Sequence, residues 1–112
     1  MDLTVREYLT AAGESPYRDW LQSLTRAVAA RIQARVLRFE SGNVGDHKSV
    51  GSGVWEARVM CGPGYRIYFG KDGGSIIVLL LGGDKKSQTK DIRRAQEHWD
   101  DYLGAKRHGK TK

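Results

Sequence analysis

Two arginines near the middle of the chain have the spacing of a phosphate-binding pair. Arg58 and Arg66 lie in two runs of alternating residues, Val54 to Met60 and Tyr65 to Phe69, which flank the turn sequence Cys-Gly-Pro-Gly. The pattern predicts a β-hairpin, and keeping its apolar side chains on one face requires an odd number of loop residues, as in a three-residue loop containing glycine. Both guanidinium groups then project from the other face, where they could bind phosphate oxygens bidentately.

Tyr68 is expected on the same face of this hairpin, with Glu56 nearby. A convergent set of two arginines and a tyrosine on rigid strands suits phosphate recognition. The same pattern also fits a solvent-facing sheet surface on which glutamate and arginine pair, so the residues alone leave both interpretations open.

A second basic cluster follows the most apolar stretch of the chain. Gly82 and Gly83 are expected to form a turn that opens the last helix, beside Lys85 and Lys86. Free N–H groups at a helix N-terminus together with two lysines suit an anion, although the spacing of a P-loop is missing. A simple turn entering a helix accounts for the same residues.

The segment before the hairpin offers a possible proton-transfer group. His47 lies in a glycine-rich stretch beside Lys48, and its intrinsic pKa suits proton transfer, although a loop histidine can equally be structural or idle. The three histidines are far apart, the single cysteine has no partner, and no zinc-ligand or G-x-S-x-G spacing occurs. The sequence therefore predicts neither a metal nor a cofactor.

The elements that position these residues follow an α+β order. We expect a strand over Leu3–Leu9, a helix starting at Ser15-Pro16, a helix capped by Thr25, the hairpin, a central strand over Ile76–Leu81, and a helix from about Gln88 to Leu103 that Gly104 stops. The order β-α-α-β-β-β-α predicts a mostly antiparallel sheet with an N-terminal helical hairpin and a C-terminal helix.

Composition limits the setting of this fold. The 112 residues suit one domain, over residues 1–104, followed by a basic and disordered tail over residues 105–112. There is no signal-peptide pattern, no apolar run long enough to cross a membrane and only one cysteine, so we expect a cytoplasmic protein. A net charge of +6 predicts a polyanionic or acidic partner, but four of these charges belong to the tail.

Three stretches of the chain closely resemble one family of toxins. They are Gly53–Arg58, Gly62–Tyr68 and Leu80–Ile92, and together with weaker matches the likeness covers roughly Leu3 to Leu103. The family is the phage-type "addiction module killer protein" branch of the RelE/ParE toxin superfamily, close to HigB-type toxins. The resemblance implies a RelE-like fold of two helices packed with a small antiparallel sheet and a C-terminal helix.

The resemblance also implies a reaction and the residues for it. RelE- and HigB-type toxins cleave mRNA in the ribosomal A site without a metal: the ribose 2′-OH attacks the adjacent phosphate and expels the 5′-oxygen. Arg66 matches the family's phosphate-stabilising arginine, and Arg58 matches a basic residue on the neighbouring strand. Lys85 or Lys86 corresponds to the basic residue after the last strand, and Lys48 would be an additional phosphate contact.

Two positions depart from the RelE pattern. Glu56 stands where RelE has a second lysine implicated in proton transfer, and Ile92 stands near the position of its C-terminal tyrosine. The hypothesis that replaces these groups makes Glu56 or His47 the general base and Tyr68 the general acid.

Three functions remain open at this stage. The first is a ribosome-dependent mRNA endoribonuclease that inhibits translation. The second is a ParE-like toxin that inhibits DNA gyrase without cleaving RNA, and the third is a degenerate member that acts only as an antitoxin partner and co-repressor. All three imply a cognate antitoxin, expected to be a helix-turn-helix protein, and the toxin–antitoxin complex would bind operator DNA.

Overall fold

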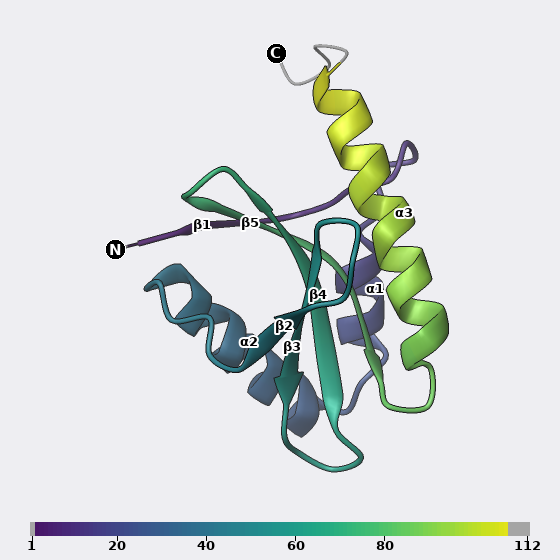
Figure 1. Cartoon of the computed structure of the whole chain (residues 1–112). Coiled ribbons are helices and arrows are strands. Elements are labelled where there is room, and N and C mark those ends of the chain that lie inside the picture. The colour runs from purple at the N-terminus through teal and green to yellow at the C-terminus, as the bar shows by residue number, and fades with distance from the viewer. Residues whose placement is uncertain (1, 108–112) are drawn as a thin grey trace.

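Five strands and three helices build the fold, in the order β-α-α-β-β-β-β-α (Figure 1). The structure is a computed structural model that describes residues 2–107. The elements are β1 (Thr4–Glu7), α1 (Pro16–Gln22), α2 (Arg26–Glu40), β2 (His47–Ser49), β3 (Val54–Val59), β4 (Tyr65–Asp72), β5 (Ile76–Asp84) and α3 (Gln88–Arg107). The α+β class is confirmed, and the short strand β2 is an addition to the expected order.

The strands form one mixed sheet in the order β1-β5-β4-β3-β2. Only the β1–β5 pair is parallel, so the sheet is mostly antiparallel, as expected. The β3–β4 hairpin pairs Val59 with Tyr65, which leaves a five-residue loop, Met60–Gly64. The predicted odd loop length is confirmed, but the expected length of three is wrong because Met60 and Gly64 do not pair.

The helices cover both faces of the sheet (Figure 1). One core lies beneath α1 and α2, where Leu21 and Phe39 pack against Ile67 and Phe69 of β4. The second core lies beneath α3, whose Trp99 is buried with residues of β3, β4 and β5. Some polar residues on this face of the hairpin are therefore covered by α3.

The helix starts follow from their capping residues. The Ser15 hydroxyl accepts a hydrogen bond of 3.0 Å from the backbone N–H of Arg18, and Pro16 is the first residue of α1. Thr25 caps α2 in the same way, accepting from Val28 at 3.3 Å. Both predicted starts are confirmed. The expected stop at Gly104 is wrong, because α3 continues to Arg107. The first three residues of the expected disordered tail, 105–107, are therefore helical, and residues 108–112 lie outside the described part of the chain.

The glycine pair after the apolar run lies in a strand, so the predicted turn at this position is wrong. Gly82 pairs with Ile67 and Gly83 pairs with Arg66, which extends β5 to Asp84. A β-bulge at Leu80 comes just before them and changes the alternation of faces. Trp20 of α1 and Asp91 of α3 occupy the space where a side chain on Gly82 or Gly83 would lie, which explains why glycine occupies both positions inside a strand.

The C-terminal end of α3 is tied to the end of β4 by Asp72. This carboxylate accepts a hydrogen bond of 2.6 Å from the Tyr102 hydroxyl and forms an ion pair with Lys106. The hydrogen bonds from Lys106 and then Tyr102 hold the pKa of Asp72 below its usual value.

Acid is expected to remove the stabilisation that Asp72 provides. Its folded-state pKa lies below the unfolded value of about 3.9, so the contribution is complete above that pH and is lost as the pH falls through the folded pKa. Asp72→Asn should therefore lose less stability than the wild type between about pH 5 and pH 2. Urea denaturation followed by circular dichroism across this range tests the prediction. Asp100→Asn is the control, since Asp100 is exposed. Equal acid sensitivity of the wild type and Asp72→Asn would contradict the prediction.

No helix within residues 2–107 is both long and apolar enough to cross a membrane.

Candidate functional site

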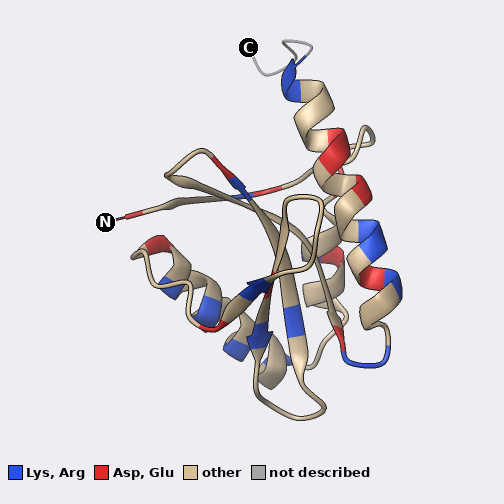
Figure 2. Cartoon of the chain, viewed as in Figure 1, with Lys and Arg blue, Asp and Glu red and all other residues tan. Residues whose placement is uncertain are grey.

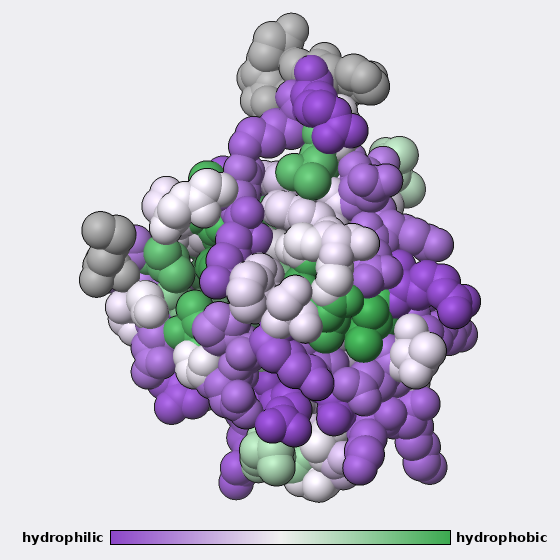
Figure 3. Space-filling model, in the orientation of Figure 1, coloured by the Kyte–Doolittle hydropathy of each residue, from purple (hydrophilic) through white to green (hydrophobic). Residues whose placement is uncertain are grey.

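A cavity of about 420 Å³ lies at the loop end of the β3–β4 hairpin. Three cationic side chains line it: Arg58 from β3, Arg66 from β4 and Lys85 from the loop after β5. Figure 2 shows blue segments on these three neighbouring parts of the fold, and more on α2. At the bottom of Figure 3, where the hairpin loop lies, weakly polar and apolar surface is bordered by hydrophilic residues.

The strand register explains why the two arginines meet. Arg58 and Arg66 are directly paired across β3 and β4, so their side chains project from the same face. On its other side Arg66 pairs with Gly83, and Lys85 follows two residues later in the chain. The three predicted phosphate-binding residues are thus brought together by pairing between adjacent strands.

Arg66 is held by a buried carboxylate. Its Nε lies 3.6 Å from Oε2 of Glu56, and the Glu56 side chain is completely buried. The same oxygen accepts a hydrogen bond of 2.9 Å from Nε2 of Gln88 at the start of α3. Glu56 therefore fixes one side of the guanidinium group and is not among the residues that line the cavity.

Tyr68 is also enclosed beneath α3. It pairs with Glu56 across the hairpin and has no exposed surface. Burial, and then the neighbouring Glu56 charge, raise the pKa of the Tyr68 hydroxyl far above its usual value. The hydroxyl stays protonated, and its burial separates it from any ligand in the cavity. The predicted general base and acid, Glu56 and Tyr68, thus lie together beneath α3 and do not line the cavity.

The remaining predicted residues lie outside the cavity. His47 is on the other face of the sheet, with its ring 5.3 Å from Trp55 and 6.0 Å from Phe69 between ring centres. Lys48 pairs with Glu56 and is exposed on the edge strand β2, and Lys86 is exposed in the loop after β5. The structure does not bring His47, Lys48 or Lys86 together with the three cavity cations.

Two residues that sequence reasoning missed line the cavity with the cations. They are Cys61 in the hairpin loop and Tyr65 at the start of β4. Tyr65 alternates with Arg66 and so belongs to the apolar side of the hairpin, and it packs partly against the core beneath α1 and α2. The sequence does indicate this role, because Tyr65 follows the loop directly and precedes Arg66. A residue at the end of a strand can contact both the core and a site beside the loop.

A buried arginine on α2 holds the backbone next to Arg58. The guanidinium group of Arg35 donates hydrogen bonds to the carbonyls of Arg58, Val44 and Asp46, the last two at 3.1 and 2.9 Å. Burial, and then the neighbouring charge of Arg38, lower the pKa of Arg35. Arg35 therefore connects α2, the segment before β2 and the end of β3, and so holds the backbone of Arg58 in place.

The charges at the cavity are only partly balanced. Arg58 lies 3.3 Å from Asp46, but both side chains are largely exposed, so this pair contributes little. Lys85 forms no ion pair with any residue between 2 and 107. In the same part of the chain, no three His, Cys, Asp or Glu side chains gather closely enough to hold a metal ion. The site can therefore bind an anion through one buried cation, Arg66, and two exposed cations, Arg58 and Lys85.

Fold and site together define a small α+β protein with a cationic cavity at one end of its sheet. The chain is 44% identical over 81 residues to a protein of Haemophilus influenzae described as uncharacterized, a match that covers 71% of this chain and 82% of that protein. The chain belongs to the same family as this protein. No family model matches the sequence.

Proposed function

We propose that the chain is a RelE-like toxin of the RelE/ParE superfamily that cleaves mRNA on the ribosome and so inhibits translation. The observation that carries the proposal is the convergence of Arg58, Arg66 and Lys85 on one cavity. Arginine binds phosphate bidentately, and strand positions keep the group in place. The family resemblance supplies the substrate, and the cavity supplies the groups that a phosphate needs.

The proposed reaction is a transesterification of RNA that uses no metal. The ribose 2′-oxygen forms a bond to the adjacent phosphorus and loses its proton to water, while the bond to the 5′-oxygen breaks and that oxygen gains a proton. The products are a 2′,3′-cyclic phosphate and a 5′-hydroxyl. Arg58 and Arg66 stabilise the charge that develops on the phosphate oxygens. We propose that Lys85 or Tyr65, which line the same cavity, donates the proton to the leaving oxygen.

A second candidate function has an observation in its favour. The carboxylate of Glu56 and the hydroxyl of Tyr68 are buried, and His47 lies across the sheet. The cavity therefore contains cations without the general base that the sequence suggested. A toxin that acts by binding, such as a ParE-like inhibitor of DNA gyrase, needs no such base.

In either case we propose that the protein acts in the cytoplasm with a cognate antitoxin, a helix-turn-helix protein that covers the Arg58 and Arg66 face. The complex of the two would bind operator DNA and repress transcription. The third function, a degenerate member without toxicity, would keep only the binding to this antitoxin and the repression of transcription.

The test is to express the chain without its antitoxin and to map new 5′ ends on translated mRNA. We expect growth arrest with new ends inside reading frames. Both should be lost in the double variant Arg58→Ala/Lys85→Ala, whose side chains are exposed enough for the fold to tolerate the change. Lys90→Ala is the matched control, because Lys90 is exposed on α3 and lies outside the cavity. Arrest without new ends would favour the gyrase function and refute the nuclease function.

A further inference from the structure

Half of strand β5 has an unpaired outer edge. β1 pairs with β5 only from Ile76 to Leu79. Of the remaining residues, Leu81–Asp84 pair with β4 on one side and Leu80 is the bulge residue, and no strand within residues 2–107 lies on the other side. A strand edge of this kind presents backbone N–H and C=O groups that can pair with another chain.

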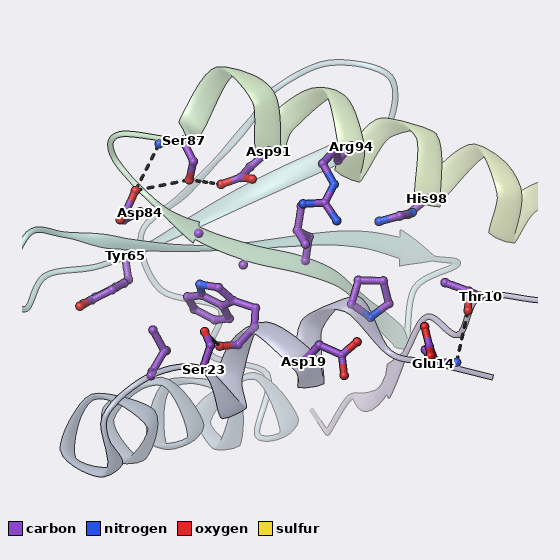
Figure 4. Close-up of a pocket in the computed structure, with 16 residues that line it drawn as sticks. Thr10, Glu14, Asp19, Ser23, Tyr65, Asp84, Ser87, Asp91, Arg94 and His98 are labelled. Carbon is purple, nitrogen blue, oxygen red and sulfur yellow. Dashed lines mark hydrogen bonds between the residues drawn. The ribbon is translucent and has the colours of Figure 1, made fainter. Parts of the chain in front are cut away.

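This edge lies along a groove between α1 and α3 (Figure 4). The groove has a volume of about 650 Å³ and is lined by residues of both helices and by Leu81–Asp84 of β5. A side chain on Gly82 would lie 2.1 Å from the ring of Trp20 in α1, and one on Gly83 would lie 1.9 Å from Asp91 in α3. The two helices thus pack against opposite faces of the strand, and Leu81–Asp84 line the groove between them.

The charge of the groove is opposite to that of the whole protein. Four carboxylates line it, from Glu14, Asp19, Asp84 and Asp91, against one arginine, Arg94. Figure 4 shows Asp19 and Glu14 on the α1 side of the groove and Asp84 near its end. The chain as a whole has a net charge of +6. A groove with this balance repels a phosphate backbone and attracts a cationic segment.

We propose that this groove binds an extended basic segment of a partner protein, which adds a strand to the edge of β5. Strand addition takes its affinity from backbone hydrogen bonds and its specificity from alternate side chains. Five unpaired residues at roughly 3.3 Å each accommodate a segment about five residues long. Its side chains would alternate between the α1 wall, with Glu14 and Asp19, and the α3 wall. The proposal does not depend on the nuclease function, since the groove and the cationic cavity are different hollows bordered in common by Tyr65.

The test uses the full chain labelled with ¹⁵N and three synthetic heptapeptides. The first alternates lysine and valine, the second has glutamate in place of lysine, and the third is the lysine peptide with alternate backbone amides N-methylated. We expect the lysine peptide to shift the amide signals of Leu80–Asp84 and to slow their hydrogen exchange at least tenfold at saturation. The N-methylated peptide should do neither, because it cannot complete the strand pairing.

A pair of protein variants separates charge from folding effects. Asp19→Lys should weaken binding of the lysine peptide severalfold, whereas Asp100→Lys, exposed on α3 outside the groove, should bind as the wild type does. Equal shifts with the N-methylated peptide, or no shifts at Leu80–Asp84, would overturn the proposal. A single-stranded RNA heptamer that shifts these same signals would also overturn it, in favour of a nucleotide site in the groove.

Discussion

Arg66→Ala is expected to lower the free energy of unfolding by about 3–5 kcal/mol, the cost of removing one partner from a buried ion pair. Arg66 is 8% exposed, and its partner Glu56 is completely buried. Without the guanidinium group, the Glu56 carboxylate keeps the hydrogen bond from Gln88 but loses the cation with which it is paired. Urea denaturation at pH 7, followed by circular dichroism, measures the loss.

Two comparisons distinguish this effect from simple loss of packing. The double variant Arg66→Ala/Glu56→Gln should recover part of the loss, because no charge is then left buried without a partner. Arg58→Ala should cost about 1 kcal/mol or less, since its pair with Asp46 is exposed. A loss for Arg66→Ala no larger than that for Arg58→Ala would show that the buried pair does not stabilise the fold as described.

Gly70→Ala should destabilise the protein through a direct clash beneath α3. A Cβ atom on Gly70 would lie 2.4 Å from two ring carbons of Trp99, which is itself buried. Because the Trp99 ring is buried, relieving the clash requires a shift of α3 or β4, and overpacking of this kind costs roughly 1–3 kcal/mol. The midpoint of thermal unfolding should fall by on the order of 10 °C.

Gly74→Ala is the matched control for this substitution. Gly74 lies in the turn between β4 and β5, and a Cβ atom there would meet no other atom within 4 Å. Its unfolding midpoint should remain within a few degrees of the wild-type value, since open surface positions change stability by roughly 0.5 kcal/mol or less. Equal midpoints for the two variants would mean that Trp99 does not pack on Gly70 as the structure has it.

The local elements of the fold could be predicted because their signals are local. Ser15 and Thr25 cap helices through their own side chains, and the hairpin's alternation determines which residues share a face. Gly82 and Gly83 were misinterpreted as a turn because glycine usually marks one. They lie in a strand because they pair with β4, and the close approach of Trp20 and Asp91 requires glycine there; no local pattern encodes such contacts.

The candidate site shows the same division. The sequence predicts Arg58 and Arg66 together because adjacent strands pair, but Glu56, predicted as a possible general base, is buried because α3 covers that part of the sheet. Alternation tells which side chains share a face and does not tell what packs against it. The sequence indicates a structural role for Arg35 more clearly, since it is a charged residue on the buried side of α2, between Ile32 and Phe39.

The parallel pairing of β1 with β5 has a consequence for synthesis of the chain. Thr4 pairs with Ile76, so the first strand finds its partner only after about 70 further residues have been made. Contacts this distant in sequence raise the contact order and slow folding, and they leave β1 without its neighbour on a chain still being translated. The sheet, and with it the face that presents Arg58 and Arg66, is therefore complete only after β5 has been made. A nascent chain remains incompletely folded on the ribosome that makes it, whatever the finished protein does to translation.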